Sequence, residues 1–117
     1  REKIQAAFGC PVYNVYGAAE TGRVASECPQ GKMHVFSFAH HVEVLDDDGR
    51  PTRPGEVGRI VVTPLHNLAM PLIRYDIGDL ARVSKAPCGC GSLLPSWDEI
   101  AGRVVHHLDR PRGHRDH

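Results

Sequence analysis

Glycine and proline interrupt this chain so often that it has room for few long helices. There are 12 Gly and 9 Pro among the 117 residues, whereas a typical chain contains roughly 12 % of the two types combined. Gly permits left-handed turns and Pro removes a backbone donor, so both divide a chain into short segments. Hydrophobic residues make up 41 % of the chain but aromatic ones only 6 %, so a core would depend mainly on Val, Ile, Leu and Ala. We expect many turns that join short strands.

The balance of charges excludes several classes of partner. Lys plus Arg number 14, Asp plus Glu also number 14, and the formal net charge is zero. Such a chain lacks the basic surplus that attracts nucleic acids or acidic membranes. The sequence also has no apolar run near the ~20 residues of a membrane span and no leader-like start. We therefore expect a cytoplasmic globular piece of a larger protein, with neither nucleic acid nor membrane as a partner.

Local patterns predict one helix followed mainly by strands. The spacing of Ile4, Ala7 and Phe8 predicts a helix over Glu2–Phe8, which Gly9 would end. Burial on both faces is expected for the strand that contains residues 60–62. Runs rich in β-branched and aromatic residues indicate strands at 11–16, 33–39, 42–45, 58–63, 72–75 and 80–83, with a solvated turn at 46–49.

A segment of small residues near the start of the chain offers a first candidate site. A strand that ends in Gly17, Ala18 and Ala19 exposes backbone N–H groups that can approach a phosphate closely. Tyr16 supplies a flat face on which a base can stack, and Glu20 can hold a hard cation beside the phosphate. The alternative is an ordinary strand and loop without a ligand, because such segments are common.

Two later segments could complete that site. The apolar residues of 70–77 hold a strand in place, Gly78 makes a bend, and Asp79 then projects from a fixed backbone. A carboxylate can accept two hydrogen bonds side by side, which suits the vicinal hydroxyls of a ribose. Arg103 follows a Gly and can contact a phosphate through two N–H groups. Taken alone, each segment also fits a structural role, for instance Asp79 as the cap of a turn.

The order and spacing of these segments resemble the adenylate-forming enzymes, most closely their phenylacetate–CoA ligase-like branch. The run 16–20 is similar to that family's Tyr-Gly-x-(Thr/Ser)-Glu motif, and 55–63 is similar to its Gly-Glu-x-Gly strand. Further similarities are the branch-specific stretches at 27–29 and 33–35, the ribose-binding motif at 71–79 and the hinge motif at 102–103. The resemblance covers residues 1–103, and the combination is specific although each piece is not.

The resemblance implies a two-step reaction and a role for each matched residue. A carboxylate attacks the α-phosphate of ATP to give an acyl-adenylate and pyrophosphate, and the thiol of coenzyme A then displaces AMP. By resemblance, Tyr16 stacks on adenine, Glu20 acts in catalysis as a magnesium ligand, Asp79 holds the ribose hydroxyls and Arg103 contacts the nucleotide. The implied partners are an aromatic or other small carboxylic acid, ATP, coenzyme A and the remainder of the parent protein.

Cys28, His34, Cys88 and Cys90 form a second constellation. Three thiolates and one imidazole can supply tetrahedral zinc ligation, and four protein ligands indicate a structural site. The tight spacing of Cys88 and Cys90 fits metal binding better than a disulfide. The alternative is a glycine turn with free thiols and an unrelated surface histidine. Cys10 has no partner in the sequence, and we expect it to be a small buried residue.

Two departures from the family's pattern bear on activity. Ala19 replaces the hydroxyl residue that reaches the phosphate, and a hydrogen bond to a charged group is worth about 1.5–3 kcal/mol. Val105 stands where the hinge motif usually has Asp or Lys. The family's upstream phosphate loop and its C-terminal domain with a catalytic Lys lie outside the 117 residues. We therefore expect the isolated chain to be inactive, and the alternative is a catalytically silent, zinc-stabilised β module.

The expected fold is an α/β fragment that is mostly β. It would contain the last strand of an α/β lobe, followed by a small antiparallel β-barrel-like subdomain. Residues 1–103 would form an internal part of the large AMP-binding domain, and 104–117 would be a disordered or cropped tail.

Overall fold

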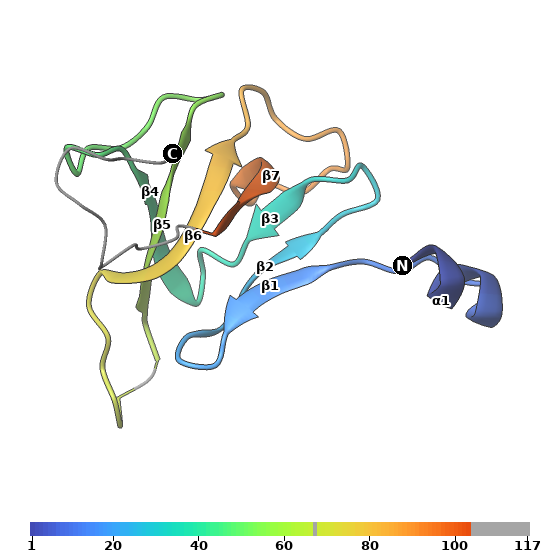
Figure 1. Cartoon of the computed structure of the whole chain (residues 1–117), viewed down its shortest axis with the longest axis horizontal. Coiled ribbons are helices and arrows are strands. Elements are labelled where there is room, and N and C mark those ends of the chain that lie inside the picture. The colour runs from blue at the N-terminus through green and yellow to red at the C-terminus, as the bar shows by residue number, and fades with distance from the viewer. Residues whose placement is uncertain (67, 104–117) are drawn as a thin grey trace, which may run out of the picture.

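The computed structural model describes residues 1–66 and 68–103, which contain one helix and one sheet (Figure 1). Helix α1 (Glu2–Phe8) buries none of its side chains and stands apart from the sheet (Figure 1). The strands are β1 (Val15–Ala18), β2 (Gly22–Glu27), β3 (Met33–Val35), β4 (His40–Leu45), β5 (Val57–Pro64), β6 (Tyr75–Val83) and β7 (Ser96–Arg103). The mostly β fold is therefore confirmed, whereas the tail at 104–117 lies outside the described residues. Within those residues, no helix is long and apolar enough to span a membrane.

The seven strands form one antiparallel sheet in the order β1-β2-β3-β7-β6-β5-β4. Its edges are β1 and β4, so the sheet is open and does not close into a complete barrel. We call β1-β2-β3 the first ladder and β7-β6-β5-β4 the second ladder. The two ladders join where β3 meets β7, through the register pairs Met33↔Trp97 and His34↔Ser96. This short contact is called the junction below.

The sheet curls strongly, and residues from distant strands meet as a result. The hydroxyl of Tyr16 on β1 donates to Oδ2 of Asp79 on β6 at 2.6 Å, although β2, β3 and β7 separate these strands in the sheet order. Nε2 of His40 on β4 donates to the carbonyl of Thr21 at 2.9 Å, and Thr21 lies in the turn between β1 and β2. These contacts join strands that are not neighbours in the sheet, which gives the expected barrel-like curvature without a closed barrel.

Both ladders contribute side chains to the hydrophobic core. Val24 from the first ladder and Ile60 and Val62 from the second are fully buried. Val61 is also buried, so the prediction that residues 60–62 are buried on both faces is confirmed. The rest of the core cluster consists of Ala25, Met33, Val35, Val44, Ile77, Ala81 and Trp97. Trp97, the only Trp in the chain, lies in the junction.

Several predicted elements are confirmed. Helix α1 has the predicted bounds, and Gly9 ends it in a left-handed conformation with φ 64°. Strands β4 and β5 contain the predicted segments 42–45 and 58–63. The turn between them is organised by Asp46, whose Oδ1 accepts the backbone N–H groups of Asp48 and Arg50 at 2.9 and 3.0 Å. Asp46 therefore organises the turn, and Asp47 and Asp48 are exposed, as expected for a solvated turn.

Other predicted strands have different bounds. Residues 11–14, 36–39 and 72–74, which were expected to be extended, lie outside the strands. At 36–39 the carbonyl of Phe36 accepts the N–H groups of Ala39 and His40, which makes a turn. Before β6, Arg74 has φ 50°, a left-handed conformation that interrupts an extended chain. Strand β6 is continuous from Tyr75 to Val83. Gly78, with φ 93°, lies within the strand, so the bend expected there does not end it.

Candidate functional site

The small-residue segment forms a tight hairpin. Gly17 and Ala18 belong to β1 and pair with β2, so the expectation of an open loop is wrong for these two residues. Gly17 approaches β2 so closely that a Cβ at this position would clash with the carbonyl oxygen of Gly22. Ala19 and Glu20 follow in the turn, and both are exposed. The hairpin therefore presents the backbone of Ala19 and the carboxylate of Glu20 to solvent.

Two residues predicted to bind the nucleotide are in direct contact. Tyr16 and Asp79 are 63 positions apart in the sequence, and the hydrogen bond between them is 2.6 Å long. Both side chains are partly buried. The ring of Tyr16 also meets the ring of Trp97 edge-on, with the ring centroids 6.0 Å apart and the planes at 72°. Because the phenol touches both the carboxylate and the indole, the orientations of Tyr16 and Asp79 depend on each other.

The backbone of β7 brings the predicted hinge residues to the same place. In the pairing of β6 with β7, Arg103 lies opposite Asp79 and Gly102 lies opposite Leu80. The first and last motifs of the chain are therefore both neighbours of Asp79, Tyr16 through its hydroxyl and Arg103 through the strand register. Val105 lies outside the described residues.

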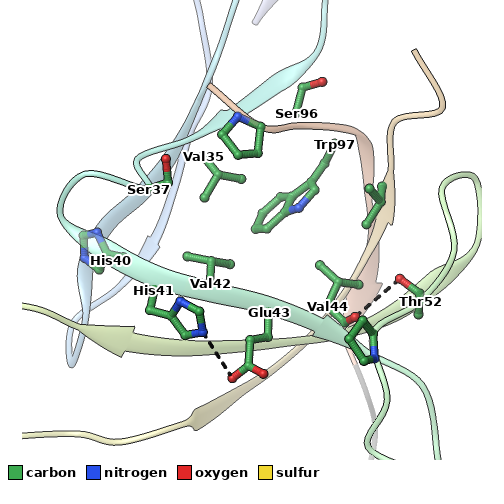
Figure 2. A pocket seen from close by; sticks show the side chains of 13 residues that line it. Val35, Ser37, His40, His41, Val42, Glu43, Val44, Thr52, Ser96 and Trp97 are labelled. Atoms are coloured by element: carbon green, nitrogen blue, oxygen red, sulfur yellow. Dashed lines mark hydrogen bonds and ion pairs between the residues drawn. The ribbon is translucent and has the colours of Figure 1, made fainter. Parts of the chain in front are cut away.

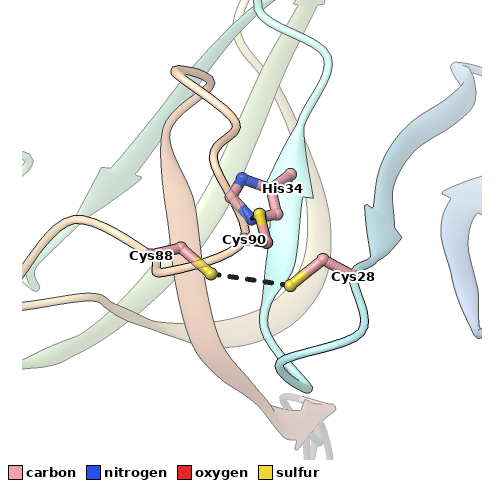
Figure 3. Close-up of side chains that lie close together, drawn as sticks. All are labelled: Cys28, His34, Cys88 and Cys90. Carbon is pink, nitrogen blue, oxygen red and sulfur yellow. Dashed lines mark hydrogen bonds between the residues drawn. The ribbon is translucent and has the colours of Figure 1, made fainter.

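Cys28, His34, Cys88 and Cys90 lie together, as Figure 3 shows, and their ligand atoms are all within 4.8 Å of one another. Sγ of Cys28 is 3.6 Å from Sγ of Cys88, and Sγ of Cys90 is 3.2 Å from Nε2 of His34. Zn–S bonds of about 2.3 Å place tetrahedral sulfurs about 3.8 Å apart. The two measured spacings are close to the edges of such a tetrahedron.

Surrounding groups orient these ligand atoms. Nδ1 of His34 contacts the carbonyl of Leu94 at 3.2 Å. Since a carbonyl can only accept, Nδ1 donates this hydrogen bond, and Nε2 faces the sulfur of Cys90 in the cluster. Backbone N–H groups of Gln30 and Lys32 donate to the sulfur of Cys28. The N–H of Ser92 donates to the sulfur of Cys90 at 3.5 Å.

These contacts also separate the acidities of two thiols. Burial raises the pKa of Cys28, but hydrogen bonds from the backbone of Lys32 and Gln30 and from Cys88 and His34 outweigh it, lowering the pKa to about 6. For Cys88, the backbone N–H of Cys90 lowers the pKa, but burial and the hydrogen bond with Cys28 outweigh it, so the pKa is raised. The pair of thiols therefore holds one thiolate near neutral pH, and the thiolate is the form that binds a metal.

A charged network that the sequence analysis missed lies beside the cluster. Nζ of Lys32 is 2.6 Å from Oδ1 of Asp98, and the hydroxyl of Ser84 donates to the same oxygen at 2.9 Å. The positive charge of Lys32 also acts on the sulfurs of Cys28 and Cys88. A sequence signal existed, because Lys32 lies between two predicted ligands, but its partner Asp98 is distant along the chain.

A half-open cavity of about 450 Å³ lies elsewhere, between Trp97 and Val35 on one side and β4 on the other (Figure 2). It is lined largely by apolar side chains, with His41 and Glu43 on the β4 side, and their side chains are 3.9 Å apart. Among the described residues, the predicted nucleotide and metal residues are not part of its lining.

Cys10 is exposed, so the prediction that it is buried is wrong. It precedes β1 in a segment outside the core.

Comparisons with known proteins identify similar sequences. The phenylacetate-coenzyme A ligase of Thermus thermophilus is 34 % identical over 109 residues, which are 89 % of this chain and 24 % of that protein. The phenylacetate-coenzyme A ligase of Escherichia coli K12 is 31 % identical over 108 residues, which are 88 % of this chain and 24 % of that protein. The chain thus spans about a quarter of the length of the curated relatives it matches. No known family profile matches it.

Solved structures show the same fold. A crystal structure of 2-hydroxyisobutyryl-CoA ligase in complex with 2-HIB-AMP and CoA has a TM-score of 0.77 and 28 % sequence identity. The match covers 88 % of this chain and 23 % of that one. An open conformation of the same ligase has a TM-score of 0.76, and the match covers 87 % of this chain and 25 % of that one.

Proposed function

This chain is related in sequence and fold to one part of the phenylacetate–CoA ligase-like, adenylate-forming enzymes, and we propose that it serves an ATP-dependent ligase that joins a carboxylic acid to coenzyme A. In the first step a carboxylate oxygen attacks the α-phosphorus of ATP and pyrophosphate leaves. In the second step the thiol sulfur of coenzyme A attacks the acyl carbon and AMP leaves. The acid would be aromatic or another small carboxylic acid. The matched ligase structures, which hold an acyl-AMP and CoA, support this class of reaction.

The contact between Tyr16 and Asp79 is the observation that carries the proposal. Two motif residues far apart in the sequence meet at 2.6 Å, and the backbone of Arg103 lies opposite the second of them. In the proposed site, the carboxylate of Asp79 accepts hydrogen bonds from the ribose hydroxyls and the ring of Tyr16 packs on the base. Arg103 would contact the nucleotide.

The β1–β2 hairpin would lie beside the phosphate of the nucleotide. Glu20 is exposed in its turn, and a single carboxylate together with phosphate oxygens is a common way to hold Mg²⁺. Bound magnesium would neutralise charge that develops on the phosphate. The chain's own part is to position that carboxylate and the backbone of Ala19 on a turn whose flanking strands are fixed by pairing.

Titration of the chain with AMP and Mg²⁺, followed by NMR, tests the nucleotide site because it detects weak binding. We expect shifts for the amides around Tyr16, Glu20 and Asp79, and Asp79→Asn should weaken AMP binding at least severalfold. Asp47→Asn, on the exposed turn of the β4–β5 hairpin, is the control and should bind AMP as the wild type does. Shifts scattered over the surface, or equal affinity for Asp79→Asn, would contradict the proposal. No ATP–pyrophosphate exchange is expected from the isolated chain.

We also propose a structural zinc ion at Cys28, His34, Cys88 and Cys90. The set of three sulfur ligands and one nitrogen ligand suits zinc, and the measured spacings suit a tetrahedron. Nδ1 of His34 donates to the carbonyl of Leu94, which leaves Nε2 to bind the metal. Four protein ligands leave no open position for a substrate, so the ion would stabilise the fold. This is also the basis of the alternative function, a zinc-stabilised β module without catalysis. Elemental analysis of protein purified without added metal should find one zinc per chain.

A further inference from the structure

The junction between the two ladders is narrow. β3 is three residues long, and two register pairs, Met33↔Trp97 and His34↔Ser96, join it to β7. By contrast, β4 and β5 are joined by six register pairs, from His40↔Pro64 to Leu45↔Arg59. Two strands joined by few backbone hydrogen bonds resist relative displacement less than two strands joined by many. The position of the first ladder relative to the second therefore depends on contacts other than sheet pairing.

The metal ligands lie on both sides of this junction. Cys28 and His34 belong to the β2–β3 hairpin of the first ladder, with Cys28 in the turn and His34 within β3. Cys88 and Cys90 lie in the loop between β6 and β7 of the second ladder. His34 also takes part in the junction itself, opposite Ser96. An ion held by all four residues would therefore tie the two ladders together where their pairing is shortest.

The hydrogen bond between Tyr16 and Asp79 crosses between the same two ladders. Tyr16 lies on β1 in the first ladder and Asp79 on β6 in the second. An O–H···O hydrogen bond is favourable over only about 2.5–3.0 Å, so a displacement of one ladder by a fraction of an ångström would weaken it. Trp97 connects the two features, because it pairs with Met33 in the junction and its ring contacts Tyr16.

We propose that the metal centre positions Asp79 through Tyr16, and that metal binding and the Tyr16–Asp79 hydrogen bond strengthen each other. The inference rests on the proposed zinc ion and concerns the regulation of the proposed nucleotide site. Loss of the metal, for example to a chelator, would loosen the junction and release the carboxylate that is to hold the ribose. Because coupling free energies are reciprocal, disrupting the hydrogen bond must weaken metal affinity by the same factor. Besides packing on the base as proposed above, Tyr16 thus positions Asp79 through its hydroxyl.

Metal affinity measured by competition with a chromophoric chelator tests the coupling without any enzymatic activity. We expect Tyr16→Phe and Asp79→Ala, neither of which removes a ligand, each to weaken zinc binding about fivefold or more. Tyr13→Phe removes the same hydroxyl from an exposed tyrosine and should leave zinc affinity unchanged. Val42→Ala lowers stability within the second ladder, so unchanged affinity there would show that general destabilisation is not the cause.

A second measurement uses the wild-type chain and so does not depend on folding of the variants. Zinc binding should shift the fluorescence of Trp97, the only Trp, and the NMR signals of the Tyr16 ring. Equal zinc affinity in Tyr16→Phe and wild type, together with signals of Tyr16 indifferent to zinc, would overturn the proposal, as would a chain that binds no zinc. Coupling without AMP binding would leave this inference standing while contradicting the proposed nucleotide site. AMP binding without coupling would overturn this inference and leave the proposed nucleotide site standing.

Discussion

Gly17 is a residue whose lack of a side chain matters in the hairpin. A Cβ there would clash with the carbonyl oxygen of Gly22, which belongs to the backbone of the paired strand and cannot move aside cheaply. We expect Gly17→Ala to lower the free energy of unfolding by about 1–3 kcal/mol, the usual cost of overpacking. Urea denaturation measures the difference. Gly89→Ala is the matched control, because a Cβ at Gly89 meets open space, and its stability should stay close to that of the wild type.

Asp98 gives the fold a dependence on acid pH. The hydrogen bond from Lys32, followed by that from Ser84, holds the pKa of Asp98 below its ordinary value. A carboxyl group with a lowered pKa stabilises the fold above its ordinary pKa near 4, and this contribution is lost as the pH falls below that value. Asp98→Asn should therefore be less stable than wild type at pH 7, and the difference should shrink towards pH 3. Both chains are compared in urea with a chelator present; an equal difference at both pH values would contradict the assignment.

At the scale of the elements, the sequence predicts the strands that are apolar and misses those that are mixed. Strand β5 contains the run 60–62, which is buried whatever its neighbours are, so its existence follows from composition. Strand β7 contains buried Trp97 and exposed Glu99, whose partner Arg82 lies on β6. Strand β2 likewise mixes exposed and buried residues, from Arg23 to Val24. Such strands depend on pairing with neighbours, which a local pattern does not contain.

Strand β5 should carry a large share of the stability. Ile60 is fully buried and contributes to the cluster that joins both ladders. Ile60→Ala should lower the free energy of unfolding by about 2–5 kcal/mol, because it removes apolar contacts and leaves a cavity. Val57→Ala, at the 38 % exposed start of the same strand, should change stability by roughly 0.5 kcal/mol or less. Similar losses in the two variants would show that β5 is not the centre of the core.

At the scale of the whole molecule, the sequence predicts the ligand atoms better than their surroundings. Cys28 and Cys88 are recognisable by residue type, and the structure brings them within 3.6 Å of each other. The hydrogen bond from Tyr16 to Asp79 and the pair of Lys32 with Asp98 arise from the curl of the sheet and the position of the junction. Those depend on packing between residues more than 60 positions apart. Such contacts have no signature in a local stretch of sequence.

Removal of the metal should therefore affect the whole fold. Ligands on both ladders make the proposed ion a cross-link between the turn after β2 and the loop before β7, and a metal bound only by the folded chain adds its binding free energy to folding. A chelator should lower the Tm of the wild-type chain by several degrees. Cys88→Ser should melt near the chelated temperature with or without chelator, because it lacks one ligand.

Cys10→Ser is the matched control for this experiment, since it makes the same atomic change at an exposed cysteine outside the cluster. It should contain one zinc per chain and respond to the chelator as the wild type does. If the thiols were merely free, Cys10→Ser and Cys88→Ser would melt alike and neither curve would respond to the chelator. A shift confined to Cys88→Ser and absent from the chelated wild type would indicate that the sulfur packs in the fold without binding a metal. The zinc content of each sample, measured alongside its Tm, separates these cases.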